Sequence, residues 1–150
     1  MEVALEINVL AAELVAMLQA QGKTFAAAES CTGGAISQAV TSVPGCSSVM
    51  RGAVVAYHND VKAGVLGVGE DTLSEYGAVS EEVVIQMVGG VSAMLGADCA
   101  VATSGIAGPG GGTPEKPVGT VWVAAKVGTD IRTRLLQLED AGRAANVKSS

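Results

Sequence analysis

Short apolar runs of strand length alternate along this chain with longer segments of helical periodicity, and this alternation restricts the fold more than any other feature. Residues 53–57 read Ala-Val-Val-Ala-Tyr, with no charged side chain among them. Such a run is typical of a strand that helices cover on both faces. Residues 23–28 and 99–103 are further candidates for buried strands. The pattern therefore predicts an α/β protein.

Helical periodicity fills the intervals between these runs. Apolar residues recur at helical spacing over residues 4–21, and Gly22 is a natural stop. Ser80, followed by two glutamates, is a suitable N-cap for a long helix that extends to residue 95. Shorter helices are expected over residues 33–41, 59–66 and 71–76, and two more strands over 120–126 and 131–138, joined as a hairpin. These elements predict a three-layer α/β/α sandwich around a mixed, mostly parallel sheet of about five strands.

The composition places all 150 residues in one domain and restricts its partners. A hydrophobic content of 49% supports a core that needs neither metal nor disulfide. The net charge of −6, without a basic cluster, argues against a nucleic-acid partner. The three cysteines, Cys31, Cys46 and Cys99, lack the spacing of a disulfide framework or a zinc site. Because no basic leader segment and no apolar run of about 18 residues is evident, we expect a cytoplasmic protein that does not contact a membrane.

Four polar, glycine-rich or hydroxyl-rich segments follow the apolar strand candidates or their connections. They are Ser30 to Gly34, Gly45 to Ser48, Tyr57 to Lys62, and Thr103 to Gly112. In an open α/β sheet such loops converge at the carboxyl ends of the strands, where ligands bind. The first segment could offer hydroxyls and backbone amides to an anionic small molecule, although ordinary turn chemistry explains the same residues. The convergence of the loops predicts a ligand site.

Two of these segments hold candidates for nucleophilic catalysis. If Asn59 caps its helix, Lys62 lies in the first turn, where the helix end lowers the pKa of a lysine and suits it to act as a base toward a serine. Ser47 lies on a short loop after a Pro-Gly turn. The ordinary alternatives are a solvated surface lysine and a serine that bonds its own backbone. His58 is the one histidine, which excludes a multi-imidazole metal centre, and we interpret it as a residue that ends a strand.

The glycine-rich run at residues 104–113 follows a strand but is not a Rossmann fingerprint. That fingerprint requires a helix directly after it, and Pro114 and Pro117 block one here. The run is better interpreted as an irregular loop whose amides approach a phosphate or an oxyanion. A purely structural connection is the alternative.

Taken together, these segments resemble a known family. Residues 28–34, 57–62 and 77–80, and residues 104–109 with 116–121, occur in register and in order over nearly the whole chain. They resemble the C-terminal domain of the competence-damage-inducible protein CinA, a family that includes stand-alone nicotinamide mononucleotide deamidases. The resemblance implies hydrolysis of the carboxamide of nicotinamide mononucleotide to nicotinate mononucleotide and ammonia, in pyridine-nucleotide recycling, without a metal or another cofactor.

The resemblance also implies roles for single residues. Ser47 would be the nucleophile and Lys62 its base, and the Tyr57 hydroxyl would relay the proton or orient the lysine. Ser30 is the alternative nucleophile. The implied substrate contacts are Ser30, Thr32, the Gly33 and Gly34 amides, Ser104 and Gly105 for the substrate or oxyanion, and Arg143 for the phosphate.

In two places the chain departs from the family pattern. Cys46 stands where the family typically has a small hydroxyl residue. Family members also continue beyond the position of Ser150 into a further C-terminal helix, which implies exposed core surface, a poorly anchored Arg143 and, we expect, a homo-oligomer. Two other functions stay open: a non-catalytic nucleotide-binding or regulatory domain, and a structural oligomerisation domain whose loops are only turns.

Overall fold

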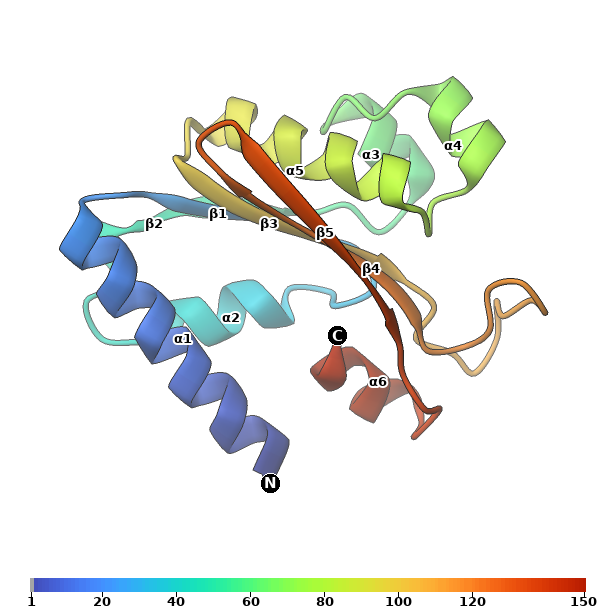
Figure 1. The fold of residues 1–150 in the computed structure, drawn as a ribbon, viewed down its shortest axis with the longest axis horizontal. Coiled ribbons are helices and arrows are strands. Elements are labelled where there is room, and N and C mark those ends of the chain that lie inside the picture. Colours follow the sequence, from blue (N-terminus) through green and yellow to red (C-terminus); the bar gives the residue numbers. More distant parts are fainter. Residues whose placement is uncertain (1) are drawn as a thin grey trace.

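The computed structural model, described for residues 2–150, is an α/β/α sandwich around a five-stranded mixed sheet (Figure 1). The strands are β1 (Phe25–Glu29), β2 (Met50–Val55), β3 (Cys99–Gly105), β4 (Thr120–Val127) and β5 (Asp130–Gln137), in the order β2-β1-β3-β4-β5. β1 pairs in parallel with β2 and β3, whereas β4 runs antiparallel to both β3 and β5. The predicted fold class and terminal hairpin are confirmed.

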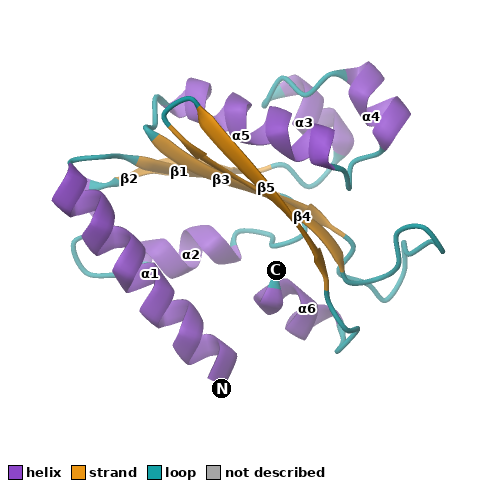
Figure 2. Cartoon of the chain, viewed as in Figure 1, coloured by secondary structure: helices purple, strands orange, loops and turns teal. Residues whose placement is uncertain are grey.

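Helices cover the two faces of the sheet (Figure 2). One layer holds α3 (Asn59–Gly64), α4 (Glu70–Tyr76) and α5 (Glu81–Leu95), and the other holds α1 (Glu2–Gln21), α2 (Ala35–Thr41) and α6 (Arg143–Ser149). A single 3-10 turn, η1 (Cys46–Ser48), precedes β2. Met87 and Val88 of α5 are fully buried against the first face, while Val15 and Phe25 belong to the core on the second.

Close packing of α5 against the chain after α3 positions one side of the candidate site. Ser80 caps α5 by accepting a hydrogen bond from the amide of Val83 at 3.3 Å, as its sequence predicts. Gly90 of α5 faces the carbonyl oxygen of Leu66, and a Cβ at position 90 would lie 2.0 Å from that oxygen. Only a glycine therefore lets α5 approach Leu66, two residues beyond α3, this closely.

Most boundaries differ from the sequence predictions by a few residues, and two elements, β2 and α6, differ for a physical reason. β2 covers Met50–Val55 rather than residues 53–57, since an edge strand tolerates the exposed Arg51 that interrupts the apolar pattern. α6 was not predicted at all. It has seven residues, and its single buried side chain is the polar Asn146, so apolar periodicity is missing.

Helix α1 is rich in apolar residues, yet most of them are exposed. Ala11, Val15 and Leu18 are buried, but Leu10 is 63% exposed and Met17 59%. By length and composition alone α1 could cross a membrane, which the sequence analysis did not expect. The buried residues show that in this fold α1 is a layer of the sandwich.

Candidate active site

A serine and a lysine meet at the carboxyl ends of two neighbouring parallel strands. Ser30 directly follows β1, and Lys62 lies on α3, the helix after β2. The Lys62 Nζ atom is 2.9 Å from Ser30 Oγ and donates a hydrogen bond to the carbonyl oxygen of Tyr57 at 3.1 Å. Both side chains are nearly enclosed, with Lys62 1% and Ser30 7% exposed. The two groups form a buried, hydrogen-bonded pair.

Burial sets the electrostatics of Lys62. Loss of water around the amine lowers its pKa, and only an ionised Cys31 thiolate would oppose this. The ion pairs formed within residues 2–150 are His58–Asp60 and Arg132–Asp130, so no carboxylate there compensates the lysine charge. A neutral Lys62 would keep one N–H on the Tyr57 carbonyl and turn its lone pair toward the Ser30 hydroxyl.

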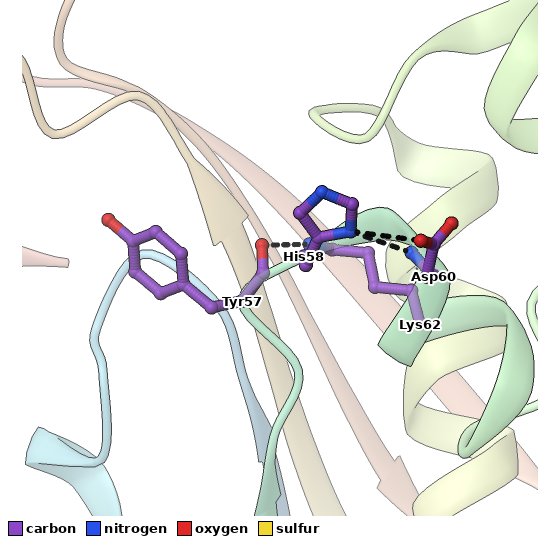
Figure 3. A network of polar contacts seen from close by, with 4 residues as sticks. All are labelled: Tyr57, His58, Asp60 and Lys62. Atoms are coloured by element: carbon purple, nitrogen blue, oxygen red, sulfur yellow. Dashed lines mark hydrogen bonds and ion pairs between the residues drawn. The ribbon is translucent and has the colours of Figure 1, made fainter.

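The helix that carries Lys62 begins differently from the prediction. His58, not Asn59, is the N-cap of α3, and its Nδ1 accepts a hydrogen bond from the Asp60 amide at 3.3 Å (Figure 3). His58 therefore has a structural role at the end of the loop, which agrees with the ordinary interpretation of this residue. The lowered pKa of Lys62 comes from burial, whereas the sequence analysis attributed it to the helix end.

Ser47 lies at the other end of the sheet. It belongs to η1, which precedes β2, while Lys62 follows β2. Glu29 pairs with Val55, so Ser30 lies beside the end of a strand that starts after Ser47. A strand of this length spans roughly 17–20 Å. The prediction that Lys62 activates Ser47 is therefore wrong, and Ser30, the alternative nucleophile, occupies that position.

A buried carboxylate shapes the turn after Ser30. Glu29, fully buried, accepts hydrogen bonds from the amides of Gly34 (3.2 Å), Ile36 (3.0 Å) and Ser37 (2.9 Å), and from the Ser37 hydroxyl. The Gly33 amide donates to the carbonyl oxygen of Ser30 at 3.0 Å. The prediction that the Gly33 and Gly34 amides face the substrate is therefore wrong, because both already have acceptors within the protein.

The two amides that directly follow Ser30 differ from those of Gly33 and Gly34. Within residues 2–150, the amides of Cys31 and Thr32 donate to no other residue. Thr32 is held from behind, since its hydroxyl lies 2.9 Å from that of the buried Thr103 on β3. Burial raises the pKa of the Cys31 thiol, which keeps it protonated near neutral pH. Glu29 and Thr103 are site residues that the sequence analysis did not single out, although a glutamate inside an apolar strand was a visible signal.

The glycine-rich loop approaches the site from β3. Ser104 is buried, and its hydroxyl donates to the Ala78 carbonyl at 2.8 Å. At Gly105 a Cβ would lie 2.7 Å from the Val121 side chain and 3.1 Å from the Cys31 sulfur. Both predicted residues thus lie behind or beside the Ser30 turn, where they fix the approach of the loop.

Arg143 and the Tyr57 side chain contact each other. The guanidinium of Arg143 donates to the Tyr57 hydroxyl and to the Gly108 carbonyl, the latter at 2.6 Å. The Tyr57 ring points away from the Lys62 amine, and its carbonyl oxygen makes the contact with the lysine (Figure 3). The predicted proton relay through the Tyr57 hydroxyl therefore does not match the geometry. The expectation of a poorly anchored Arg143 is also wrong.

A groove of about 530 Å³ borders the site without reaching the reactive pair. It lies between α1, α2 and the last four residues of the chain, and Thr32 is part of its wall. Neither Ser30 nor Lys62 lines it. Thr32 is thus the point at which this groove meets the turn that carries Ser30.

Fold and site together define the class: an α/β/α domain with a buried serine–lysine pair at the carboxyl end of a mixed sheet, and with an exposed arginine bonded to the glycine-rich loop. The chain belongs to the CinA C-terminal domain family, whose pattern it matches over residues 7–150. The similarity thus covers nearly all of the fold, including every residue of the site.

Relatives support this membership in sequence and in structure. A CinA-like protein of Thermotoga sp. (strain RQ2) is 58% identical over 110 residues, which are 73% of this chain and 27% of that protein. The chain spans less than a third of the length of the curated relatives it matches. Among solved structures, the competence/damage inducible protein CihA from Agrobacterium tumefaciens is 40% identical with a TM-score of 0.93, over 95% of this chain and 87% of that one. The competence damage-inducible protein A (ComA) from Klebsiella pneumoniae is 35% identical with a TM-score of 0.92, over 95% and 88%.

Proposed function

We propose that this domain is an amidohydrolase that converts nicotinamide mononucleotide to nicotinate mononucleotide and ammonia. The observation that carries the proposal is the 2.9 Å contact between Lys62 Nζ and Ser30 Oγ inside the protein. Amide hydrolysis requires an activated nucleophile, a base that is neutral when the nucleophile attacks, and fixed donors for the oxyanion. The site offers a candidate for each requirement.

In the proposed reaction Ser30 Oγ attacks the carboxamide carbon, and its proton passes to Lys62 Nζ. The developing oxyanion accepts hydrogen bonds from the amides of Cys31 and Thr32. The intermediate collapses as Lys62 returns the proton to the leaving nitrogen, which departs as ammonia and leaves an ester on Ser30. Water then attacks this ester while Lys62 accepts its proton. The acid product leaves, and the proton returns to Ser30 Oγ.

Arg143 is the proposed partner of the substrate phosphate. Its side chain is exposed, lies beside the glycine-rich loop and rests on two neutral acceptors, so no carboxylate within residues 2–150 neutralises it. Guanidinium groups bind phosphate through paired N–H donors. The exchange of two neutral partners for a phosphate dianion would draw the nucleotide toward Ser30.

Ammonia release from nicotinamide mononucleotide tests the proposal, with nicotinamide riboside as the substrate that lacks the phosphate. We expect turnover of the nucleotide, a large preference for it over the riboside, and loss of most of this preference in Arg143→Ala. Lys62→Ala should fold and be inactive. An active Lys62→Ala protein would reject the proposed base. Tight nucleotide binding without turnover would favour the non-catalytic binding domain instead.

The cellular context of the domain is part of the same proposal. A cytoplasmic location, a small-molecule substrate rather than a nucleic acid or membrane, and a homo-oligomeric state are all expected from the sequence. Light scattering coupled to size exclusion would measure the oligomeric state directly. A monomer at micromolar concentration would reject that part and leave the chemistry untouched.

A further inference from the structure

One polar side chain in the last helix is buried, although its helix has little apolar surface. Asn146 of α6 is 2% exposed, while Arg143 on the same helix is exposed to solvent. α6 lies on the same side of the sheet as α1 and α2 (Figure 1). Since α6 has seven residues and no other buried side chain, polar contacts hold it in place.

Asn146 uses both ends of its amide. Its Nδ2 donates to the Ala107 carbonyl and to Asp140 Oδ1, each at 3.0 Å, and its Oδ1 accepts from the Ala141 amide at 3.1 Å. The partners fix the orientation of the amide, because a carbonyl and a carboxylate accept and an N–H donates. Asp140 Oδ1 also accepts from the Gly142 amide, and these two donors lower the pKa of Asp140. These hydrogen bonds hold the backbone at Gly142, the residue just before Arg143.

Asn146 and Arg143 hold consecutive carbonyl groups of the glycine-rich loop. Asn146 binds the Ala107 oxygen and Arg143 the Gly108 oxygen, from positions three residues apart on one face of α6. When a phosphate takes the guanidinium from Gly108, Asn146 is the contact that still ties α6 to the loop. The buried amide of Asn146 thus fixes the position of the Arg143 backbone relative to the loop.

We propose that Asn146 is a positioning residue that holds Arg143 in place for the anionic group of the substrate. The inference rests on the proposed function, since it assigns a partner to the arginine of that site. Asn146 touches neither Ser30 nor Lys62, so its loss should weaken binding of the anion and leave the chemical step intact. Loss of Asn146 should therefore weaken the binding of substrates that carry a phosphate, and not the binding of uncharged nicotinamide.

A double-mutant cycle on KM separates positioning from general support of the fold. Asn146→Ala should raise KM for nicotinamide mononucleotide about tenfold with kcat changed less than about twofold. Arg143→Ala should raise KM at least as much. In the double variant, KM should equal that of Arg143→Ala alone, because Asn146 acts through the arginine. Lys148→Ala, an exposed cation on the same helix, is the matched control and should leave KM unchanged.

A second network variant and a binding measurement complete the test. Asp140→Ala removes an exposed support of the same network and should raise KM about threefold, again with no further effect in Arg143→Ala, so the test survives if Asn146→Ala fails to fold. Calorimetric binding of nicotinate mononucleotide to Ser30→Ala follows the same variants without turnover. If the fold-increases in KM of the Asn146→Ala and Arg143→Ala variants multiply in the double variant, the inference is overturned. Absence of both turnover and binding in the parent protein would instead reject the proposed function.

Discussion

The two ends of the sheet carry serines in similar short loops but in opposite surroundings. Ser30 follows β1, is 7% exposed and lies 2.9 Å from a buried amine. Ser47 precedes β2 and is exposed, and its turn is tied to the end of α1 by Gln19, which donates to the Gly45 carbonyl at 3.1 Å. A serine hydroxyl is a weak nucleophile until a group such as an adjacent base activates it. Ser30 follows its strand whereas Ser47 precedes the neighbouring strand, so Ser30 is the serine at the strand end that carries Lys62.

Replacement of each serine by alanine tests this contrast most directly. Ser30→Ala should lower kcat/KM for nicotinamide mononucleotide by at least about 10³-fold, because the reacting oxygen is lost. Ser47→Ala, an exposed change distant from the site, should alter kcat/KM less than about twofold. Steady-state ammonia release measures both. An unchanged Ser30→Ala with an inactive Ser47→Ala would reverse the assignment.

Replacement of Lys62 should sharpen the contrast, since activity and stability move in opposite directions. Lys62→Met should lower kcat by about 10²–10⁴-fold through loss of the base. The same variant should melt at a higher temperature, because an apolar chain of similar length removes a buried amine without a carboxylate partner.

The pH dependence has a definite sign. Burial lowers the folded-state pKa of Lys62 below its ordinary 10.5, so the unfolded chain binds more protons between the two values. The stability of the parent protein should therefore rise with pH through this window, and Lys62→Met should lose that rise. Activity of the parent should also increase with pH through the lowered pKa, as the neutral base forms. A parent whose activity falls as pH rises there would contradict Lys62 as the base.

Chain order alone contained more information about the site than motif content did. Ser47 stands before the strand and Lys62 after it in the sequence, so a parallel strand must separate them. The convergence of loops after β1, β2 and β3 was likewise predictable, because these three strands run in parallel.

Other features depend on contacts that no local pattern records. No sequence pattern shows that the Gly34 amide has an acceptor, whereas in the fold Glu29 accepts from it and from two further amides. Lys62 is 1% exposed and contacts Ser30, 32 positions earlier in the chain, so its surroundings cannot be deduced from its neighbours in sequence. Helix α6 has no apolar periodicity. Its one buried side chain, Asn146, holds it in place by hydrogen bonds.

Adjacent glycines in α5 offer a matched test of how the Lys62 side of the site is supported. Gly90→Ala places a Cβ 2.0 Å from the Leu66 carbonyl and should lower the free energy of unfolding by about 3 kcal/mol. Gly89→Ala meets nothing within 4 Å and should raise it by about 0.5–1 kcal/mol, as expected for alanine in a helix interior. Urea unfolding measures both. Equal effects would show that α5 does not press on the chain after α3.

The Ser30 side of the site is supported by Glu29, and we expect its replacement to have a smaller effect on stability than Gly90→Ala. Glu29→Gln turns an NH2 group toward a set of donors and leaves a part-buried amide among residues 34–37 unpaired, at a cost of about 2 kcal/mol in unfolding free energy. Ser37→Ala keeps all three amide bonds to the carboxylate and should cost only about 1 kcal/mol. Because the Glu29 side chain holds amides just after those of Cys31 and Thr32, which we propose bind the oxyanion, Glu29→Gln should also lower kcat more than it raises KM. If kcat is unchanged while stability falls, the turn serves the fold alone and the oxyanion must be bound elsewhere.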